Sequence, residues 1–386
     1  MQIFDPFEKK EKSDAVALGI DLGTTHTLAA YLDENKEVQF IHWEDFGEEF
    51  GEECSKECSK ERSILLPSVV SFSKNSVGKD FDFASTKRFM PEAFRVLKEG
   101  KTALDVAVEI LRYVKQKAEE QIKKEIAHVV ITVPAYFDDA ARLSTKIAGE
   151  KAGFVVRRII NEPTAAALAY HIEKEGLYAV YDFGGGTFDL SVLRMQRGVF
   201  QVLSTIGDLN LGGDDIDTAI LSSWEKDESC RPMAKAAKEA GLIDNFEEMI
   251  QPFVDRTLKL SAKGLADARV TKLDGVILVG GSTRLKGLYD TLKDFFNTTL
   301  YCDKNPDLVV VMGAAIQSHA LLHGSDHVLI DVNPLSIGLE IMGGVSDKII
   351  SRNTPLPIQK EQMFLPQNHK QRIDLLFQCD RPKQPL

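Results

Sequence analysis

Two stretches of the chain share one pattern of apolar and polar positions. Each has an apolar run that contains Asp near its end, a turn rich in Gly and Thr, and a second apolar run: 16–32 is VALGIDLGTTHTLAAYL and 178–195 is YAVYDFGGGTFDLSVLRM. This pattern predicts a strand, a tight turn and a returning strand in both places. We therefore expect two similar α/β lobes around a central cleft, with the two hairpins facing each other across it.

Other periodicities fill in the lobes. Apolar residues recur near every fourth position between 102 and 125, which predicts an amphipathic helix. Residues 127–134 predict a buried strand, and a helix follows over 138–153, with Asp138 as its cap. Residues 63–72 predict another strand, and 275–281 a strand that feeds a helix beginning near Ser282.

Composition narrows the class of protein. The 386 residues are 44% hydrophobic and 27% charged, which is enough apolar mass for two or more packed lobes. A net charge of −11 argues against a nucleic-acid-binding protein. The chain has no apolar run long enough for a membrane span, and its N-terminus lacks the apolar segment of a secretory signal, so neither is expected. The five scattered cysteines favour cytoplasmic thiols. Cys54 and Cys58 lie in an acidic repeat without further ligands, so we interpret it as a solvated loop.

The two turns have the composition of a phosphate site. Glycine allows backbone N–H groups to approach a phosphate, threonine hydroxyls can donate to its oxygens, and an Asp at each strand end can hold Mg²⁺ through water. One such turn is often an ordinary hairpin, but two in matching positions favour a nucleotide. The residues concerned are Asp21, Gly23, Thr24 and Thr25 in the first turn, and Asp182, Gly184, Gly185, Gly186 and Thr187 in the second.

A third element is VGGSTR at 279–284. Two glycines at a strand end, followed by Ser and Thr, suit a ribose or an adenine edge packed against the backbone, with Arg284 stacking on the base. By itself, this Gly-Gly pair is only a tight turn between a strand and a helix.

These elements, in this order, resemble the actin–hexokinase–chaperone ATPase fold, and longer strings narrow the resemblance to the heat-shock protein 70 chaperone family. The strings are GIDLGTT, VVITVPAYFDDAAR, INEPTAAALAY, YDFGGGTFDLSVL, LGGDDID, VILVGGSTR, GAAIQ and DVNPLSIGLEIMGG, which span roughly 16–352. Within the family, ITVPAYFDDA, RGVFQVLSTIGD and LGGDDID are most similar to the HscA-like branch, which serves iron–sulfur cluster assembly, and next to the DnaK-like branch.

The resemblance implies a role for each matching residue. Lys87 would be the catalytic lysine, Glu162 the carboxylate near the attacking water, and Asp21 and Asp182 the Mg²⁺-shell aspartates. Thr187 and Asp189 belong to the second phosphate turn, and Pro134 and Arg142 to a switch between domains. The nucleotide site is implied to include also Gly212, Gly213, Gly280, Gly281, Ser282, Arg284 and Asp307. Without the resemblance, Lys87 would be interpreted as a solvated lysine beside Arg88.

The resemblance also implies a division into domains. An ATPase domain is expected over 14–326, with lobes of about 14–170 and 171–326, then an apolar linker at 327–331 and part of a peptide-binding β-sandwich at 332–386. The stretches 77–102 and 217–275 are shorter than in the family, as if outer subdomains were reduced. Met233–Ala240 is similar to the helix that clasps adenine, and either Lys235 or Lys238 could replace the adenine clamp.

The implied function is an ATP-hydrolysing chaperone with ATP or ADP and Mg²⁺ as ligands. Its partners would be unfolded or scaffold client proteins, a J-domain co-chaperone and a nucleotide exchange factor, without nucleic acid or membrane. Two alternatives stay open: a degenerate nucleotide-binding homologue, because of the shortened subdomains, and a small-molecule kinase of the same superfamily. A kinase would need a base for a substrate hydroxyl, and it would have no use for the linker string VLIDVNPLSIGLE.

Overall fold

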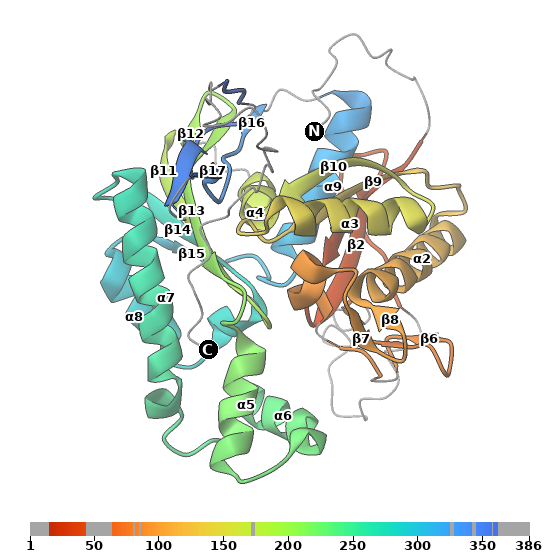
Figure 1. The fold of residues 1–386 in the computed structure, drawn as a ribbon, viewed down its shortest axis with the longest axis horizontal. Helices are drawn as coiled ribbons and strands as arrows, with labels where there is room; N and C mark the ends of the chain where they lie inside the picture. Colours follow the sequence, from red (N-terminus) through yellow and green to blue (C-terminus); the bar gives the residue numbers. More distant parts are fainter. Residues whose placement is uncertain are drawn as a thin grey trace.

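The computed structural model describes most of the chain. The described residues are 15–43, 64–79, 82–84, 86–170, 174–324, 328–341, 345–356 and 358–361. They form a mixed α/β structure with two six-stranded sheets (Figure 1). Cys54 and Cys58 lie outside the described residues.

The first sheet contains the first predicted hairpin. Its strands lie in the order β10 (Val155–Asn161), β9 (His128–Val133), β1 (Ala17–Leu22), β2 (His26–Leu32) and β3 (Val38–Phe40), with β4 (Leu66–Pro67) paired to β2. β1 pairs with β2 antiparallel and with β9 parallel, so the end of β1 lies in the middle of the sheet. The predicted strand at 63–72 is wrong in extent, because this stretch forms β4 and a separate β5 (Val70–Ser71), with Ser63 outside the described residues.

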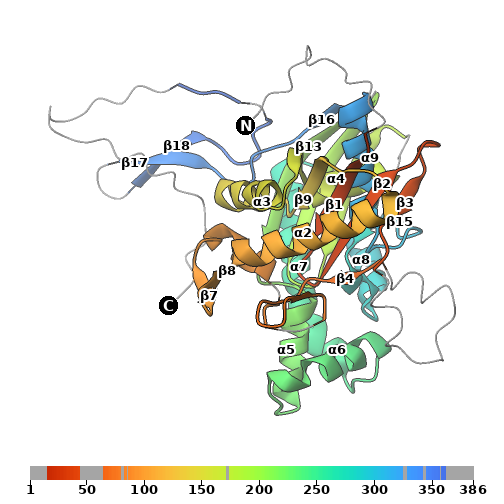
Figure 2. The same cartoon turned by 90° about the vertical axis from the view of Figure 1, so that its right-hand side faces the viewer.

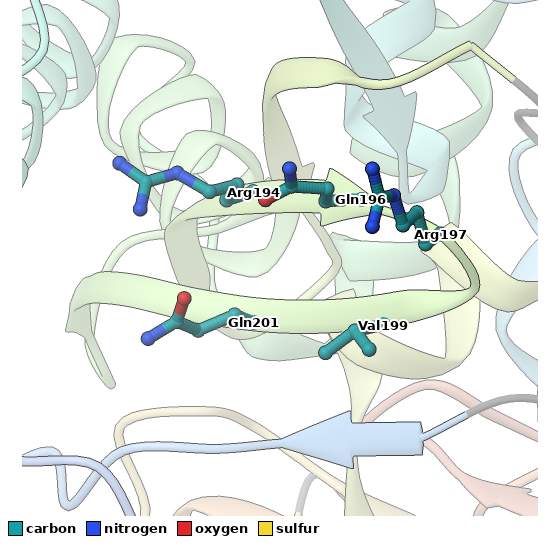
Figure 3. A pocket seen from close by; sticks show the side chains of 5 residues that line it. All are labelled: Arg194, Gln196, Arg197, Val199 and Gln201. Carbon is teal, nitrogen blue, oxygen red and sulfur yellow. The ribbon is translucent and has the colours of Figure 1, made fainter.

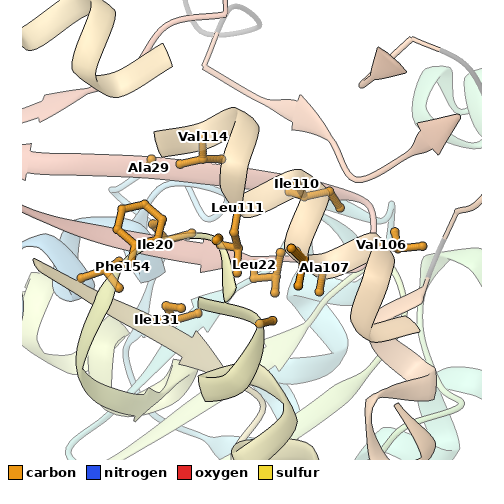
Figure 4. Close-up of a cluster of buried hydrophobic side chains, with 14 of the residues drawn as sticks. Ile20, Leu22, Ala29, Val106, Ala107, Ile110, Leu111, Val114, Ile131 and Phe154 are labelled. Atoms are coloured by element: carbon orange, nitrogen blue, oxygen red, sulfur yellow. The ribbon is translucent and has the colours of Figure 1, made fainter. Parts of the chain in front are cut away.

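Helices α2 (Ala103–Ile122) and α3 (Asp139–Lys151) follow the predicted ranges closely. α2 begins after Thr102, whose Oγ1 accepts from the N–H of Asp105 at 3.2 Å while the Asp105 carboxylate accepts from the Thr102 N–H at 2.9 Å, a capping box. α3 begins after Asp138, as expected. The apolar face of α2 packs on the first sheet through residues such as Val106, Ile110 and Val114 (Figure 4).

The second sheet repeats the arrangement. Its strands lie in the order β15 (Leu300–Tyr301), β14 (Gly275–Val279), β11 (Gly176–Phe183), β12 (Phe188–Gln196), β13 (Val199–Asp208) and β16 (Val328–Ile330). Its helices are α5 (Gly213–Ser223), α6 (Arg231–Ala240), α7 (Phe246–Ala268) and α8 (Leu288–Phe296). The expected helix at Ser282 is wrong: β14 leads into one 3₁₀ turn, η4 (Gly281–Arg284), and the α-helix begins only at Leu288. Leu285 causes the break, because its backbone is extended with ψ 133°.

Two helices join the sheets. α4 (Glu162–Tyr170) and α9 (Val309–His323) contribute to an apolar cluster that also contains Val130 from the first sheet and Val180 from the second. The helices approach closely at Gly313, where an added Cβ would lie 1.7 Å from the carbonyl oxygen of Ala165. This contact between the two backbones limits how closely α4 and α9 can approach, and so how the two sheets are joined.

The remaining elements are short. They are η2 (Thr86–Glu92), β6 (Ser76–Val77), β7 (Val96–Lys98), β8 (Lys101–Thr102), η3 (Glu228–Cys230), β17 (Ile337–Ile341) and β18 (Val345–Ile350). Figure 2 shows α5 and α6 at one end of the molecule and the β17–β18 hairpin toward the other. None of the helices in the described ranges is long and apolar enough to cross a membrane.

Candidate functional site

The two glycine-containing turns meet directly between the lobes. A Cβ added to Gly185 would lie 2.1 Å from Thr25 Oγ1, and one added to Gly186 would lie 2.6 Å from Thr24 Cγ2. A side chain at either position of the second turn would therefore displace the threonines of the first turn. The expectation that the hairpins face each other is confirmed by these contacts.

Acidic side chains gather at the ends of the central strands. Asp21 lies near the end of β1 and accepts a 2.7 Å hydrogen bond from Thr132 Oγ1, and Asp182 lies near the end of β11 in the other lobe. Asp189, the second residue of the returning strand, pairs with Asp182, and its Oδ1 accepts from the N–H of Tyr136 at 3.2 Å. The site therefore receives carboxylates from both sheets.

Lys87 reaches this acidic group from η2. Its Nζ lies 2.5 Å from Glu162 Oε1, at the first residue of α4, and both side chains are buried. The sequence predicted these two residues for one site although 75 positions separate them, and the structure brings them together.

Burial and mutual repulsion decide the protonation behaviour of the group. Burial raises the pKa of Asp182 well above its usual value, and the nearby charges of Glu162 and Asp21 raise it further. Burial raises the pKa of Asp189 well above its usual value, and the nearby charges of Glu162 and Asp182 raise it further. Burial lowers the pKa of Lys87, but the surrounding carboxylates outweigh that effect and raise it, so the ammonium stays charged. If all of these carboxylates were ionised together the site would carry excess negative charge, which a divalent cation would offset.

Unpartnered buried atoms point to a polar ligand at the same place. Thr25 Oγ1, Arg88 Nε and Asp189 Oδ2 are buried without a hydrogen-bond partner. Leaving such a group unpaired costs about 1–3 kcal/mol, so several in one site favour a bound group that pairs them. Two of the three are donors beside glycine turns and one is an acidic acceptor. This set fits phosphate oxygens together with a water-shelled Mg²⁺ held by Asp21 and Asp182.

The predicted adenosine elements pack against the second turn. Gly213 N–H donates to Gly184 O at 3.0 Å, and Ser282 Oγ donates to the same oxygen at 2.8 Å. A Cβ on Gly212 would lie 2.4 Å from Gly185 O, and one on Gly280 would lie 2.4 Å from Phe183 O. The structure therefore brings these four residues together beside the phosphate turns, as the sequence predicted.

Two basic side chains frame the outer part of this region. Arg284 Nη1 lies 2.6 Å from Asp307 Oδ2, and Nη2 donates to Asn305 Oδ1 at 2.6 Å, with about half of the arginine side chain exposed. Gly281 lies beside this pair, since its Cβ would be 3.0 Å from Asp307 Oδ1. Of the two lysines left open by the sequence, Lys238 contacts the glycine segment, because its Nζ donates to Gly213 O at 2.9 Å and pairs with Asp217 at 2.6 Å.

Two features were missed by the sequence reasoning. Arg88 forms an ion pair with Asp215 of α5, 2.7 Å from Nη2 to Oδ2, and so links the lobes. Its one signal was its place next to Lys87. Asn161 Nδ2 donates to Asp331 Oδ2 just after the linker strand, and Asn161 Oδ1 accepts from Arg142 Nη2 at 2.6 Å. The position of Asn161 directly before Glu162 was the one signal in the sequence for this second feature.

A separate hollow lies away from this chemistry. It has a volume of about 360 Å³ and is lined by Arg194, Gln196, Arg197, Val199 and Gln201, on two adjacent strands and the turn between them (Figure 3). These residues occupy the end of the β12–β13 hairpin opposite to Asp189 and beside the linker strand β16. The hollow is therefore a surface next to β16 and no part of the site between the two glycine turns.

Comparisons with known proteins agree with the site. Residues 90–231 and 242–381 match the family described as Hsp70 protein. The chain is 38% identical to the "Chaperone protein HscA homolog" of Methylibium petroleiphilum, over 94% of this chain and 68% of the relative. It is 37% identical to the proteins of the same name from Burkholderia multivorans, over 90% and 66%, and from Rickettsia bellii, over 94% and 67%. The chain thus spans about two thirds of the length of these relatives.

Proposed function

The chain belongs to the Hsp70 family, whose members are ATP-hydrolysing chaperones, and we propose that it binds ATP, hydrolyses it and couples hydrolysis to the handling of other proteins. The observation that carries this proposal is the buried Lys87–Glu162 pair, placed among aspartates of both lobes where the two glycine turns meet. The names of the relatives support an HscA-like role in iron–sulfur cluster assembly.

The residue types suit hydrolysis of a phosphoanhydride. Phosphoryl transfer to water depends mainly on charge stabilisation and on alignment of the nucleophile. Lys87 would supply positive charge at the terminal phosphate, and Glu162 and Thr187 would orient the attacking water. Asp21 and Asp182 would hold the water shell of Mg²⁺, with Asp189 close by, and this cation would neutralise phosphate charge. Thr24, Thr25 and the glycine amides would hold the phosphates, and Ser282, Arg284 and Asp307 the adenosine.

We propose that docking of the linker affects the position of the catalytic carboxylate of Glu162. β16 adds to the edge of β13 in parallel, with Leu329 opposite Phe200. Asp331 then accepts from Asn161, the residue before Glu162, and Arg142 Nη2 donates to both Asn161 Oδ1 and the Ala135 carbonyl. A linker that leaves the sheet edge would release this network, and so change the position of Glu162. Pro134 belongs to the same segment.

We propose that the ATPase domain is 14–326 and the linker 327–331, and that 332–386 is part of a peptide-binding β-sandwich. The antiparallel pair of β17 and β18 supports this last assignment without completing a sandwich among the described residues. The proposed partners are unfolded or scaffold proteins, a J-domain co-chaperone and a nucleotide exchange factor, in the cytoplasm.

A single-turnover experiment tests the proposal against its alternatives. The chain is mixed with radiolabelled ATP and Mg²⁺, with glucose or acetate present as a competing acceptor. Release of inorganic phosphate at a rate independent of the acceptor supports the ATPase. Label on the acceptor would identify a kinase, and binding without turnover a degenerate homologue.

A further inference from the structure

Arg88 carries more hydrogen-bonding capacity than its ion pair uses. The guanidinium group has five N–H donors in one plane. Nη1 donates to Asp215 Oδ1 at 3.2 Å and Nη2 to Asp215 Oδ2 at 2.7 Å, a two-point contact along one edge of the plane. Nε lies on the other edge, where it is buried without a partner.

The free edge of Arg88 points at the second phosphate turn. A Cβ added to Gly186 would lie 2.9 Å from Arg88 Nε, and 2.8 Å from Thr24 Oγ1 of the first turn. Arg88 Nε therefore lies where the two turns meet, beside the backbone that is proposed to hold phosphates. A buried guanidinium N–H at this place lacks only an acceptor, and phosphate oxygens are its preferred acceptors.

Asp215 is itself held in place. It lies in the first turn of α5, and its Oδ2 accepts from the N–H of Gly212 at 2.8 Å. The carboxylate is thus fixed to the backbone next to the second turn, and it fixes the plane of the Arg88 guanidinium in turn. This arrangement leaves Arg88 little freedom to rotate, so the direction of Nε is set before any ligand arrives.

We propose that Arg88 is a polyphosphate ligand of this chain, and that Asp215 is its positioning residue. The inference rests on the proposed nucleotide-binding function and adds to it a contact to the di- or triphosphate. Arg88 would donate from Nε to a phosphate oxygen while Asp215 keeps the opposite edge. The competing interpretation is that the pair only latches the two lobes together, with no contact to the nucleotide.

Binding of nucleotides with different phosphate content distinguishes these interpretations. The intact chain and its variants are titrated by calorimetry with ATP, ADP and adenosine, with Mg²⁺ present. A charge-assisted hydrogen bond is worth about 1.5–3 kcal/mol, so Arg88→Ala is expected to weaken ATP and ADP binding by about 10- to 100-fold. Adenosine affinity is expected to stay unchanged. Asp215→Asn should weaken ATP binding by a smaller factor, because Arg88 stays but loses its fixed direction.

Arg95→Ala is the matched control, since Arg95 belongs to the same segment but its ion pair with Glu92 is exposed. Its affinities should equal those of the wild type. Arg88→Lys serves if the alanine variant does not fold. A lysine keeps the positive charge but has no second N–H edge that could donate to a phosphate while the first contacts Asp215. The affinities for ATP and ADP should therefore still fall several-fold.

The outcomes separate this inference from the proposed function. A wild-type chain that binds no nucleotide would refute the proposed function, and the inference with it. Wild-type ATP binding with unchanged affinity in Arg88→Ala and Arg88→Lys would refute only the inference. Equal losses for ATP, ADP and adenosine, matched by Asp215→Asn, would show a latch and would also overturn it.

Discussion

Lys87 Nζ and Glu162 Oε1 lie 2.5 Å apart in a buried site where the lobes meet. Because this ammonium faces several carboxylates, we expect it to act mainly in the transition state, when phosphate charge develops. Lys87→Ala and Thr187→Ala should each leave ATP affinity within a few-fold of wild type and slow hydrolysis by about 10²–10³-fold. Single-turnover rates and calorimetric affinities measure the two effects separately.

The control for this pair of variants is thermal unfolding without nucleotide. Lys87→Ala leaves Glu162 buried without its cation, so a lowered unfolding midpoint is expected there and not in Thr187→Ala. Equal hydrolysis rates in wild type and both variants would show that neither residue has its proposed role.

The outer part of the site should contribute little to affinity. Lys238 of α6 contacts the glycine segment through a single hydrogen bond to Gly213 O, and Arg284 is half exposed. We expect ATP binding to be weaker than in longer relatives, with fast ADP release that an exchange factor accelerates little. A stopped-flow chase of labelled ADP measures the release. A slowly released, tightly held ADP would contradict this prediction.

Local pattern was enough for some elements of the structure and not for others. The two hairpins, the start of α2 and the Asp138 cap of α3 were predictable, because strand alternation, glycine turns, helical periodicity and caps act within a few residues. Lys87 had no local signal, and only the family resemblance pointed to it. The Arg88–Asp215 pair joins positions 127 apart, so it depends on how the lobes pack. The predicted helix at Ser282 was wrong because extended Leu285 interrupts it, and the one local mark of that change was Gly287, which has φ +81° directly before α8.

Gly313 provides a test of how the lobes are joined. Alanine would gain about 1 kcal/mol of helix propensity in α9, but its Cβ would lie 1.7 Å from the backbone oxygen of Ala165. A collision with backbone cannot be relieved by a rotamer change, and overpacking typically costs about 1–3 kcal/mol or more. We expect Gly313→Ala to lower the midpoint of urea unfolding clearly.

Gly264→Ala is the matched control in another helix. Its Cβ would meet side-chain methyl groups, the nearest being Leu190 Cδ2 at 2.9 Å, and these can move. A smaller loss of stability is therefore expected than for Gly313→Ala. Equal midpoints for the two variants would mean that α4 and α9 separate at little cost.

The linker strand can be tested through Leu329. This residue packs against the cluster shared by both lobes, whereas Val328 beside it is 54% exposed. A carboxylate at position 329 would lose solvation when the strand docks, and at 328 it would not. Leu329→Asp should raise amide hydrogen exchange at 328–330 by about tenfold or more, equivalent to ~1.4 kcal/mol, and Val328→Asp should change it little. Equal exchange in the two variants would contradict docking through the Leu329 side chain.

Peptide capture by the β17–β18 segment should be poor. β17 and β18 pair with each other, and a two-stranded ribbon has little stability of its own. The segment is instead tied to the second lobe: Arg352 forms an ion pair with Asp267, and Asn353 Oδ1 accepts from the Thr205 N–H at 3.2 Å.

An added peptide strand gains main-chain hydrogen bonds, but its specificity and much of its affinity come from side-chain pockets. Leu335 and Leu339, apolar side chains of this segment, are already buried, each 8% exposed. Fluorescence anisotropy with an extended apolar peptide should therefore show a Kd weaker than micromolar, both with and without ATP. Arg352→Ala, which removes one of these ties, should not create a tight site. Micromolar capture that ATP weakens would overturn the prediction and restore client binding to this chain.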